Sequence, residues 1–415
     1  MTSPPERPFN VRSVAVAVFL PTLVFAIGEG AIIPIIPVVA DSLGATLAVA
    51  GFIAAMIMVG ELLGDIPSGW VVSRIGERTS MIAASFLSIV GLVIAMLAPN
   101  PWFLAFGILL VGLATAVFAL ARHAFMTTYI PVVYRARALS SLGGTFRFGY
   151  FIGPFISAGV IHLTGTSSSV FWIHVVACLL AAGILLFLPD PASTFGGAAG
   201  KPREGGDFVA REARGLFTTM WTSRGVLVKL GAGAALIGAL RASRQVILPL
   251  WAVSIGISDT NTALIIGLAG GVDFALFYAS GQIMDRFGRL WTAVPSMIGL
   301  GAGHLILAFT HDAPGRVAWF IAVAILLSLA NGIGSGLLMT LGADLADKDD
   351  PAPFLGAWRF TGDAGSAAAP LAVSLVTALA SLAIASGIMG VFGFLGAGIL
   401  ARYLPRYLPR DRRIA

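Results

Sequence analysis

The sequence predicts an all-α integral membrane protein whose twelve transmembrane helices form two pseudo-symmetric six-helix bundles. Hydrophobic residues make up 57% of the 415 residues, charged residues only 11%, and the mean hydropathy is +0.92. A soluble protein of this size needs far more charge to cover its surface. The apolar residues fall in runs long enough to cross a bilayer. Short polar motifs recur at a constant offset of 212 residues, as in Gly69 and Gly281.

The individual spans follow from the length rule that a helix needs about 20 apolar residues to cross a bilayer. The rule places them at 13–39, 47–70, 80–98, 102–126, 138–163, 168–188, 225–256, 261–283, 290–310, 316–341, 354–380 and 382–403. These runs do not alternate in polarity, as barrel strands do. The first run is interpreted as a retained span, because no small-residue cleavage site follows a short apolar region.

Charged residues in the connections predict the topology. Lys and Arg gather on one side of the membrane, whereas Arg316 is the only basic residue in the loops of the other side. The excess of basic residues marks the cytoplasmic side, so a multi-pass cell-membrane protein with both termini in the cytoplasm is expected. The predicted domains are a cytoplasmic tail (1–12), a six-helix bundle (13–188), a cytoplasmic linker (189–224), a second bundle (225–403) and a basic cytoplasmic tail (404–415).

The linker contains a candidate amphipathic helix. Asp207 can cap it, Leu216 and Trp221 share an apolar face, and Arg211 lies on the opposite face. Such a helix would lie on the cytoplasmic membrane surface. A disordered linker is the alternative.

The repeat extends over both halves of the chain. Matching pairs are Pro37 and Pro249, Gly44 and Gly256, Ser68 and Ser280, Arg74 and Arg286, Gly76 and Gly288, and Arg147 and Arg359. Apolar matches would be common by chance in such a sequence, but arginines that match within membrane spans would not. The two halves are therefore predicted to be parallel repeats around a central cavity.

The loop between the second and third spans of each half carries the most specific motif. Gly281, Asp285, Arg286, Gly288 and Arg289 match the pattern Gly-x-x-x-Asp-Arg-x-Gly-Arg in full. The first half retains part of the pattern, in Gly69, Arg74 and Gly76; Ser73 replaces the acid, and Arg78 comes one place late.

On these motifs, the chain resembles the major facilitator superfamily over about residues 12–404. The resemblance implies the major facilitator fold and a secondary active transporter that works by alternating access. It also implies that the loop motifs stabilise a cytoplasmically closed state through charge contacts at helix ends.

The fifth span is similar to a signature of the drug:proton antiporter branch. Gly149, Gly153 and Pro154 match it, and Ser157 and Ala158 replace its last two glycines. This resemblance implies proton-coupled efflux of a lipophilic small molecule. Small residues are also common packing devices in membrane helices. Proton-coupled uptake of a small organic solute stays open, as does a non-transporting membrane sensor on the same fold.

Ionisable side chains within the spans are the candidate functional groups, because each costs about 2.5–3.5 kcal/mol to insert. They are Glu29, Glu61, Asp65, Arg122, Arg147, Arg241, Arg244, Asp273, Arg359 and Asp363. Asp65 is interpreted as a support for the loop motif, and Arg122 as an interfacial anchor.

Four of these charges are predicted to form a gate between the bundles. Glu61 and Asp273 are related by the repeat, as are Arg147 and Arg359. In the fold of the family, span two faces span eleven and span five faces span eight. The hypothesis is therefore two symmetric bridges, Glu61–Arg359 and Asp273–Arg147, that seal the cytoplasmic side. Pairing within each bundle is the alternative.

Glu29 is the first candidate for a residue that binds the coupling proton or the substrate. It lies near the middle of span one, and its repeat partner is Arg241, with Arg244 one turn away on the same face. Glu29 and Arg241 are predicted to face each other across the cavity, where Glu29 binds the coupling proton or a cationic substrate. Asp363 is the second choice for the proton. A static Glu29–Arg241 bridge is the alternative.

Other classes of protein fit poorly. The sequence has no nucleophile elbow and no P-loop, so an enzyme is not expected and ATP is not the expected energy source. The five histidines lack metal-ligand spacing, and the lone Cys178 cannot form an intramolecular disulfide. The expected partners are a small-molecule substrate, protons and the lipid bilayer, with no cofactor, metal or nucleic acid, and the protein is expected to work as a monomer.

Overall fold

The computed structural model describes residues 18–129, 132–187, 216–347 and 351–408. All secondary structure in these ranges is helical. Twelve helical stretches in them are long and apolar enough to cross a membrane, and each overlaps one predicted span. The predicted start of the first span, at residue 13, lies outside the described residues. Within the described residues this span begins at Leu20.

The first six spans form one group of helices. In chain order its elements are α2 (Leu20–Ile32), η2 (Ile33–Ile35), α3 (Ile36–Ser42), α4 (Leu47–Ile75), α5 (Glu77–Met96), α6 (Pro101–Tyr129), α7 (Val132–Thr164), η3 (Ser167–Val170) and α8 (Phe171–Phe187). Span one comprises α2, η2 and α3. Its 3-10 turn contains Pro34 and is followed by Pro37, and proline lacks the amide donor that a regular helix needs.

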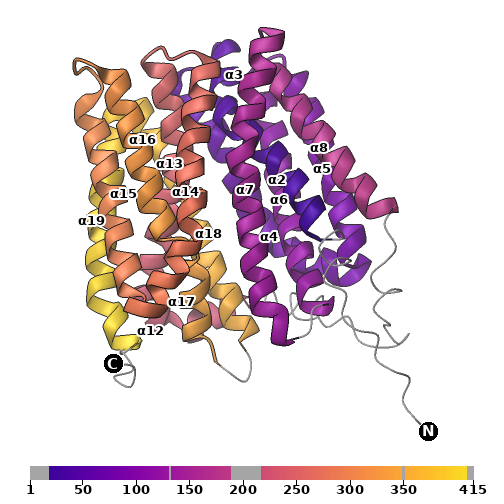
Figure 1. The fold of residues 1–415 in the computed structure, drawn as a ribbon, viewed down its shortest axis with the longest axis vertical. Coiled ribbons are helices and arrows are strands. Elements are labelled where there is room, and N and C mark those ends of the chain that lie inside the picture. The colour runs from indigo at the N-terminus through magenta and orange to yellow at the C-terminus, as the bar shows by residue number, and fades with distance from the viewer. Residues whose placement is uncertain (1–17, 130–131, 188–215, 348–350, 409–415) are drawn as a thin grey trace.

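The last six spans form the second group. Its elements are α11 (Leu216–Thr222), α12 (Arg224–Val226), η4 (Leu227–Gly231), α13 (Ala232–Ser254), α14 (Asp259–Phe287), α15 (Leu290–Thr310), α16 (Arg316–Ile333), α17 (Leu337–Leu345), α18 (Ala352–Leu379) and α19 (Leu382–Tyr407). Figure 1 shows the two groups side by side, the first from indigo to magenta and the second from orange to yellow. Helix α4 packs against α18, and α7 against α14, across the boundary between them.

Paired glycines end equivalent elements in the two halves. Gly76 follows α4 with φ 84°, and Gly288 follows α14 with φ 93°. Gly44 and Gly256, in the turns at the other side of the membrane, have φ 80° and 75°. Only glycine adopts this left-handed region without strain. Both pairs obey the 212-residue offset, so the repeat extends to the backbone. We call the side with Gly76 and Gly288 the motif side.

Span ten is broken in the middle. Helix α16 ends at Ile333 and α17 begins at Leu337, with Gly336 between them at φ 74°. The Ser280 hydroxyl lies 2.6 Å from the Ile333 carbonyl oxygen and 2.7 Å from that of Ser335. Irregular backbone at membrane depth is tolerated where protein groups satisfy it in this way.

The predicted amphipathic helix falls largely outside the described residues. Only its end is described, as α11, where Leu216 is buried and Phe217 and Trp221 are exposed. Its placement on a membrane surface therefore stays a prediction, as do the proposed domain boundaries.

Candidate functional site

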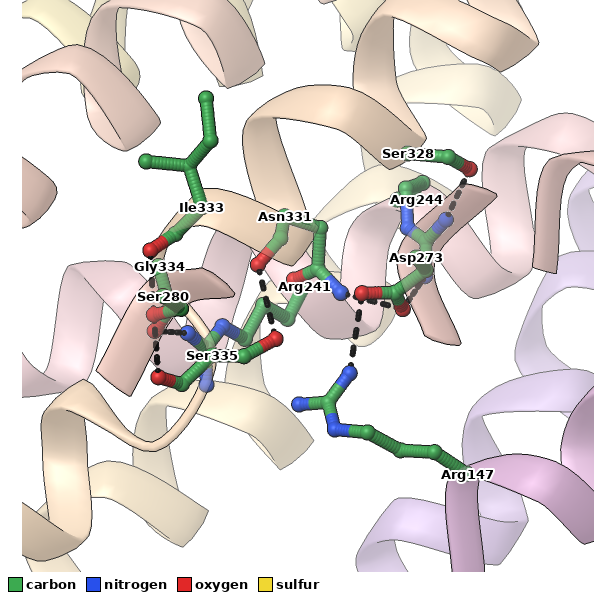
Figure 2. A network of polar contacts seen from close by, with 10 residues as sticks. All are labelled: Arg147, Arg241, Arg244, Asp273, Ser280, Ser328, Asn331, Ile333, Gly334 and Ser335. Carbon is green, nitrogen blue, oxygen red and sulfur yellow. Dashed lines mark hydrogen bonds and ion pairs between the residues drawn. The ribbon is translucent and has the colours of Figure 1, made fainter. Parts of the chain in front are cut away.

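An ion pair joins the two bundles near the middle of the membrane spans. Arg147 on α7 places Nη1 2.9 Å from Oδ1 of Asp273 on α14. Figure 2 shows Arg147 reaching Asp273 from the neighbouring bundle. The sequence predicts this contact, and the structure contains it. Its role as a gate stays a prediction.

The second oxygen of Asp273 belongs to a network within the C-terminal bundle. Asn331 on α16 donates from Nδ2 to Asp273 Oδ2 at 2.7 Å, and Nη2 of Arg244 lies 3.5 Å from the same oxygen. Arg244 also donates from Nη1 to the Ser328 hydroxyl at 2.8 Å. Asp273 is thus held by two guanidinium groups and one amide (Figure 2).

Arg241 lies one turn from Arg244 but contacts the break in span ten. Its Nη2 donates to the Gly334 carbonyl oxygen at 2.5 Å. Helix α16 ends at Ile333, and the carbonyl end of a helix carries partial negative charge that favours a cation. Arg241 therefore helps to hold the backbone where span ten is interrupted.

Glu29 is buried within the N-terminal bundle, with none of its surface exposed. The Thr115 hydroxyl on α6 donates to Glu29 Oε1 at 2.8 Å, while Oε2 has no hydrogen-bond partner in the part of the chain that is described. Tyr150 and Arg122 are its other polar neighbours. Arg122 also lies 4.7 Å from the centre of the Phe146 ring. Arg122 therefore takes part in a buried polar cluster, which its interpretation as an interfacial anchor did not anticipate.

The alternative of a static Glu29–Arg241 bridge is wrong, and their facing across the cavity stays a prediction. Glu29 is bonded to Thr115 in the first bundle, and Arg241 to Gly334 in the second. The repeat relates their positions in the chain, but each side chain finds its partner within its own bundle. The spacing of residues in the sequence does not predict Thr115 as the partner of Glu29, because threonines in apolar runs commonly bond to their own helix.

The second predicted bridge forms with a different acid. Arg359 Nη2 on α18 lies 3.4 Å from Asp65 Oδ1 on α4, and its Nε lies 3.9 Å from Asp363 Oδ2. Glu61 is not among the ion-pair partners of Arg359 in the described ranges, so the Glu61–Arg359 bridge is wrong. Asp65 lies one helical turn nearer the motif side than Glu61, on the same face of α4. The bundles are still joined here, by a residue interpreted as a support for the loop motif.

The loop motif of the second half makes charge contacts at helix ends. Arg289 Nε lies 2.9 Å from Asp344 Oδ2 on α17, and its Nη1 lies 3.3 Å from Asp285 Oδ1. The hydrogen bond to Asp344 raises the pKa of Arg289, which lies between two spans. In this half Arg286 packs over the Phe287 ring at 5.4 Å, and Gly281 has open space around it.

The first half uses its basic residues differently. Arg78 donates to the Leu185 and Leu186 carbonyl oxygens at the end of α8, at 2.6 and 3.2 Å. Arg74 lies 5.1 Å from the centre of the Trp70 ring, and Gly69 is buried in α4. The arginine that comes one place late in this half of the motif therefore has main-chain oxygens of α8 among its partners.

At the antiporter-like motif, α7 approaches α2 closely. A Cβ added at Gly149 would lie 2.6 Å from the Ala26 Cβ, and one at Gly153 would lie 2.5 Å from the Ala31 nitrogen. Ser157 donates to the Ala31 carbonyl oxygen at 2.8 Å. Gly149 and Gly153 therefore allow α7 to pack closely against α2, the helix that carries Glu29, and Pro154 is buried beside Gly153.

The family model for the Major Facilitator Superfamily matches residues 18–370. The chain belongs to the major facilitator superfamily. It is therefore a multi-pass membrane transporter and not an enzyme. Transporters of this family need no cofactor, and proton coupling is typical of them. Among the residues that the structure describes, no group of three or more His, Cys, Asp and Glu side chains could hold a metal ion.

Relatives of this superfamily member differ in what they transport. A class G tetracycline resistance protein of Vibrio anguillarum is 27% identical over 341 residues, which are 80% of this chain and 82% of that protein. The galactose-proton symporter of Escherichia coli K12 is 24% identical over 173 residues, covering 42% of this chain and 37% of the symporter. A probable inositol transporter of Arabidopsis thaliana is 27% identical over 138 residues, which are 33% of this chain. The match spans only 24% of that inositol transporter.

Solved structures of other members show the same fold. The inward-open xylose transporter XylE from E. coli superposes with a TM-score of 0.74 at 15% identity, covering 98% of both chains. A POT family transporter in complex with a thioalcohol-conjugated peptide gives 0.76 at 13% identity, covering 96% of this chain and 97% of the other. At these identities the likeness concerns the fold alone.

Proposed function

We propose that this transporter exports a lipophilic small molecule in exchange for protons, by alternating access of a cavity between the two bundles. The tetracycline resistance protein supports export, because its match covers most of both chains. The antiporter-like motif supports the same direction. The single observation that carries the proton coupling is the fully buried Glu29 carboxyl, with one bonded and one unpartnered oxygen.

Glu29 has the environment that a proton carrier needs. An ionised carboxylate is costly in an apolar interior unless hydrogen bonds or a nearby cation stabilise it. Thr115 supplies one hydrogen bond, and Arg122 supplies a positive charge in the same cluster. A small movement of α6 relative to α2 would change both contributions together. The affinity of Glu29 for a proton would then depend on the conformation of the bundle, as coupling requires.

The gate of this proposal consists of the two ion pairs between the bundles. Arg147–Asp273 and Arg359–Asp65 join α7 to α14 and α18 to α4. Both pairs must separate if these helices part on the motif side. Asp363, beside Arg359, would receive more of that cation's charge once Asp65 is withdrawn. It is the second proton site in this proposal.

Proton-coupled uptake is the second candidate, and the matches to the galactose-proton symporter and the inositol transporters favour it. The proposed setting is the cell membrane, with the motif side and both termini in the cytoplasm and a monomer as the working unit. The charge distribution of the loops supports this orientation.

The test is transport in proteoliposomes under an imposed pH gradient. Radiolabelled tetraphenylphosphonium and 2-naphthoate would serve as lipophilic probes of opposite charge. Movement of either probe against the proton flow would support export, and movement with the protons would support uptake. The Glu29→Gln variant should lose proton-driven transport, whereas Asp312→Asn, at an exposed site, should keep it. Full coupling in Glu29→Gln would remove Glu29 from the mechanism.

A further inference from the structure

The C-terminal half of the site carries more positive charge than its own carboxylates balance. Arg147 and Arg244 both contact Asp273, the one carboxylate in the network of Figure 2, and Arg241 lies one helical turn from Arg244 on α13. No acid of the described residues forms an ion pair with Arg241, whose hydrogen bond goes to the neutral Gly334 carbonyl. We propose that Arg241 and Arg244, with Arg147, bind the anionic group of the transported molecule, so that the substrate is an amphipathic organic anion such as a carboxylate.

Unpartnered polar atoms point to the same place. The Nε atoms of Arg241 and Arg244 and the Oδ1 atom of Asn331 are enclosed and have no hydrogen-bond partner within the described parts of the chain. Buried donors of this kind are rare, because each one forfeits its bonds to water. Two such donors, the Nε atoms of Arg241 and Arg244, lie one helical turn apart on α13 and favour a further acceptor, whereas Asn331 Oδ1 is itself an acceptor and requires a donor.

The contact between Arg244 and Asp273 is the one that an incoming anion can replace. Its length is 3.5 Å, whereas charge-assisted N–H···O bonds usually measure about 2.7–2.9 Å. Asp273 would keep Arg147 at 2.9 Å and Asn331 at 2.7 Å if Arg244 turned away. Arg244 could then join Arg241, one turn away on α13, in holding a planar carboxylate.

The N-terminal half of the site has an excess of negative charge, which is balanced in a different way. Glu29, Glu61, Asp65 and Asp363 outnumber the cations Arg122 and Arg359 in their cluster. A buried carboxylate can take up a proton and become neutral, as the proposed coupling requires. An arginine cannot lose its proton in a protein. The acids are therefore suited to carry protons, while the excess arginine charge requires an anion.

The consequence is a division of tasks between the bundles. The anion would bind mainly to α13, while Arg147 from α7 can contact the same region across the bundle interface. An anion at Arg241 and Arg244 would also compete with Asp273 for nearby positive charge. This inference names the substrate class of the site and rests on the proposed transport function.

Binding of matched probes to the protein in lipid nanodiscs tests the inference without a proton gradient. Radiolabelled 2-naphthoate and decanoate would be compared with 2-naphthamide and decanamide, which have similar shapes but no charge, and with 2-naphthylmethylammonium. The wild-type protein should bind at least one carboxylate at least tenfold more tightly than its amide. Equal or tighter binding of the amides or of the ammonium probe would overturn the inference, and so would failure of both carboxylates to bind.

Variants assign the binding to the arginines. Arg241→Gln and Arg244→Gln should each weaken carboxylate binding at least tenfold and leave amide binding unchanged. Arg241→Lys keeps the charge and should retain more affinity than Arg241→Gln, which separates charge recognition from support of the helix break. Arg316→Gln, on the opposite side of the membrane, is the matched control. Carboxylate binding without proton-dependent flux would leave this site standing and overturn the proposed transport mechanism instead.

Discussion

Replacing Asp273 with asparagine keeps the shape of the side chain and removes the charge that joins the two bundles. Two unit charges 2.9 Å apart attract each other by about 6 kcal/mol at an effective dielectric constant of about 20. Desolvation of two largely buried side chains offsets most of this attraction. A net loss of about 2 kcal/mol would change the ratio of closed to open states roughly thirtyfold.

Double electron–electron resonance, which measures distances between spin labels, would detect this shift from closed to open states. Ile75 and Phe287 are exposed, end α4 and α14 on the motif side, and are related by the repeat. Labels on cysteines at these positions, in a Cys178→Ala background, should lie farther apart in Asp273→Asn than in the parent. Asp273→Glu keeps the charge and should remain close to the parent distribution. Asp312→Asn, at a side chain that is 94% exposed, is the control.

An unchanged distance distribution in Asp273→Asn would refute the reasoning, because the bridge would then contribute nothing to closure. If the distance distribution were unchanged in Arg147→Gln as well, the Arg359–Asp65 pair would be the remaining candidate for the gate among the inter-bundle ion pairs of the described residues. A shift in both variants, but not in the control, would support the gate.

Two further predictions compare matched pairs of variants, and a third compares one variant at different salt concentrations and pH values. Gly153→Ala should lower the stability of the purified protein by about 1–3 kcal/mol because its methyl group meets α2, whereas Gly159→Ala on the same helix has open space; thermal unfolding compares them. Ser280→Ala should cost about 1–3 kcal/mol because the carbonyls of Ile333 and Ser335 lose the one hydroxyl donor that they share, whereas its repeat partner Ser68 bonds only within its own helix, so Ser68→Ala should be nearly neutral in the same assay. Arg289→Ala should cost at most about 1 kcal/mol at low salt and less at high salt, since its ion pair is partly exposed. Because Asp344 raises the pKa of Arg289, that loss should be the same at pH 7 and pH 9.

The membrane spans were predictable because the cost of exposing backbone and charge to lipid leaves few alternatives. The sequence matched Gly76 with Gly288 in the repeat, and in the structure both occupy a backbone region that other residues avoid. The Arg147–Asp273 contact followed from the repeat together with the helix order of the family. These features depend on the order of elements and not on the rotation of single side chains.

The remaining contacts depend on rotation and reach, which one sequence does not specify. Arg359 contacts Asp65 instead of Glu61 because a long side chain can reach either of two acids one turn apart. The break in span ten was missed because hydropathy runs through it without interruption. Its signal lay in the spacing of Gly332, Gly334 and Gly336, which a length rule does not weigh. Thr115 had no signal, since its importance comes only from its distance to Glu29.

The interruption of span ten gives the two halves of this protein unequal mechanical properties. Around the break the main chain forms short-range bonds, from Ser335 N to Gly332 O at 3.1 Å and from Leu337 N to Gly334 O at 3.2 Å. Helix α17, nine residues and about 13 Å long, can therefore tilt without breaking a regular ladder. The equivalent span of the first half, α6, is continuous over 29 residues and would have to kink. Of the two repeat-related spans four and ten, only span ten has acquired such a joint, and the motion of the two is expected to be asymmetric.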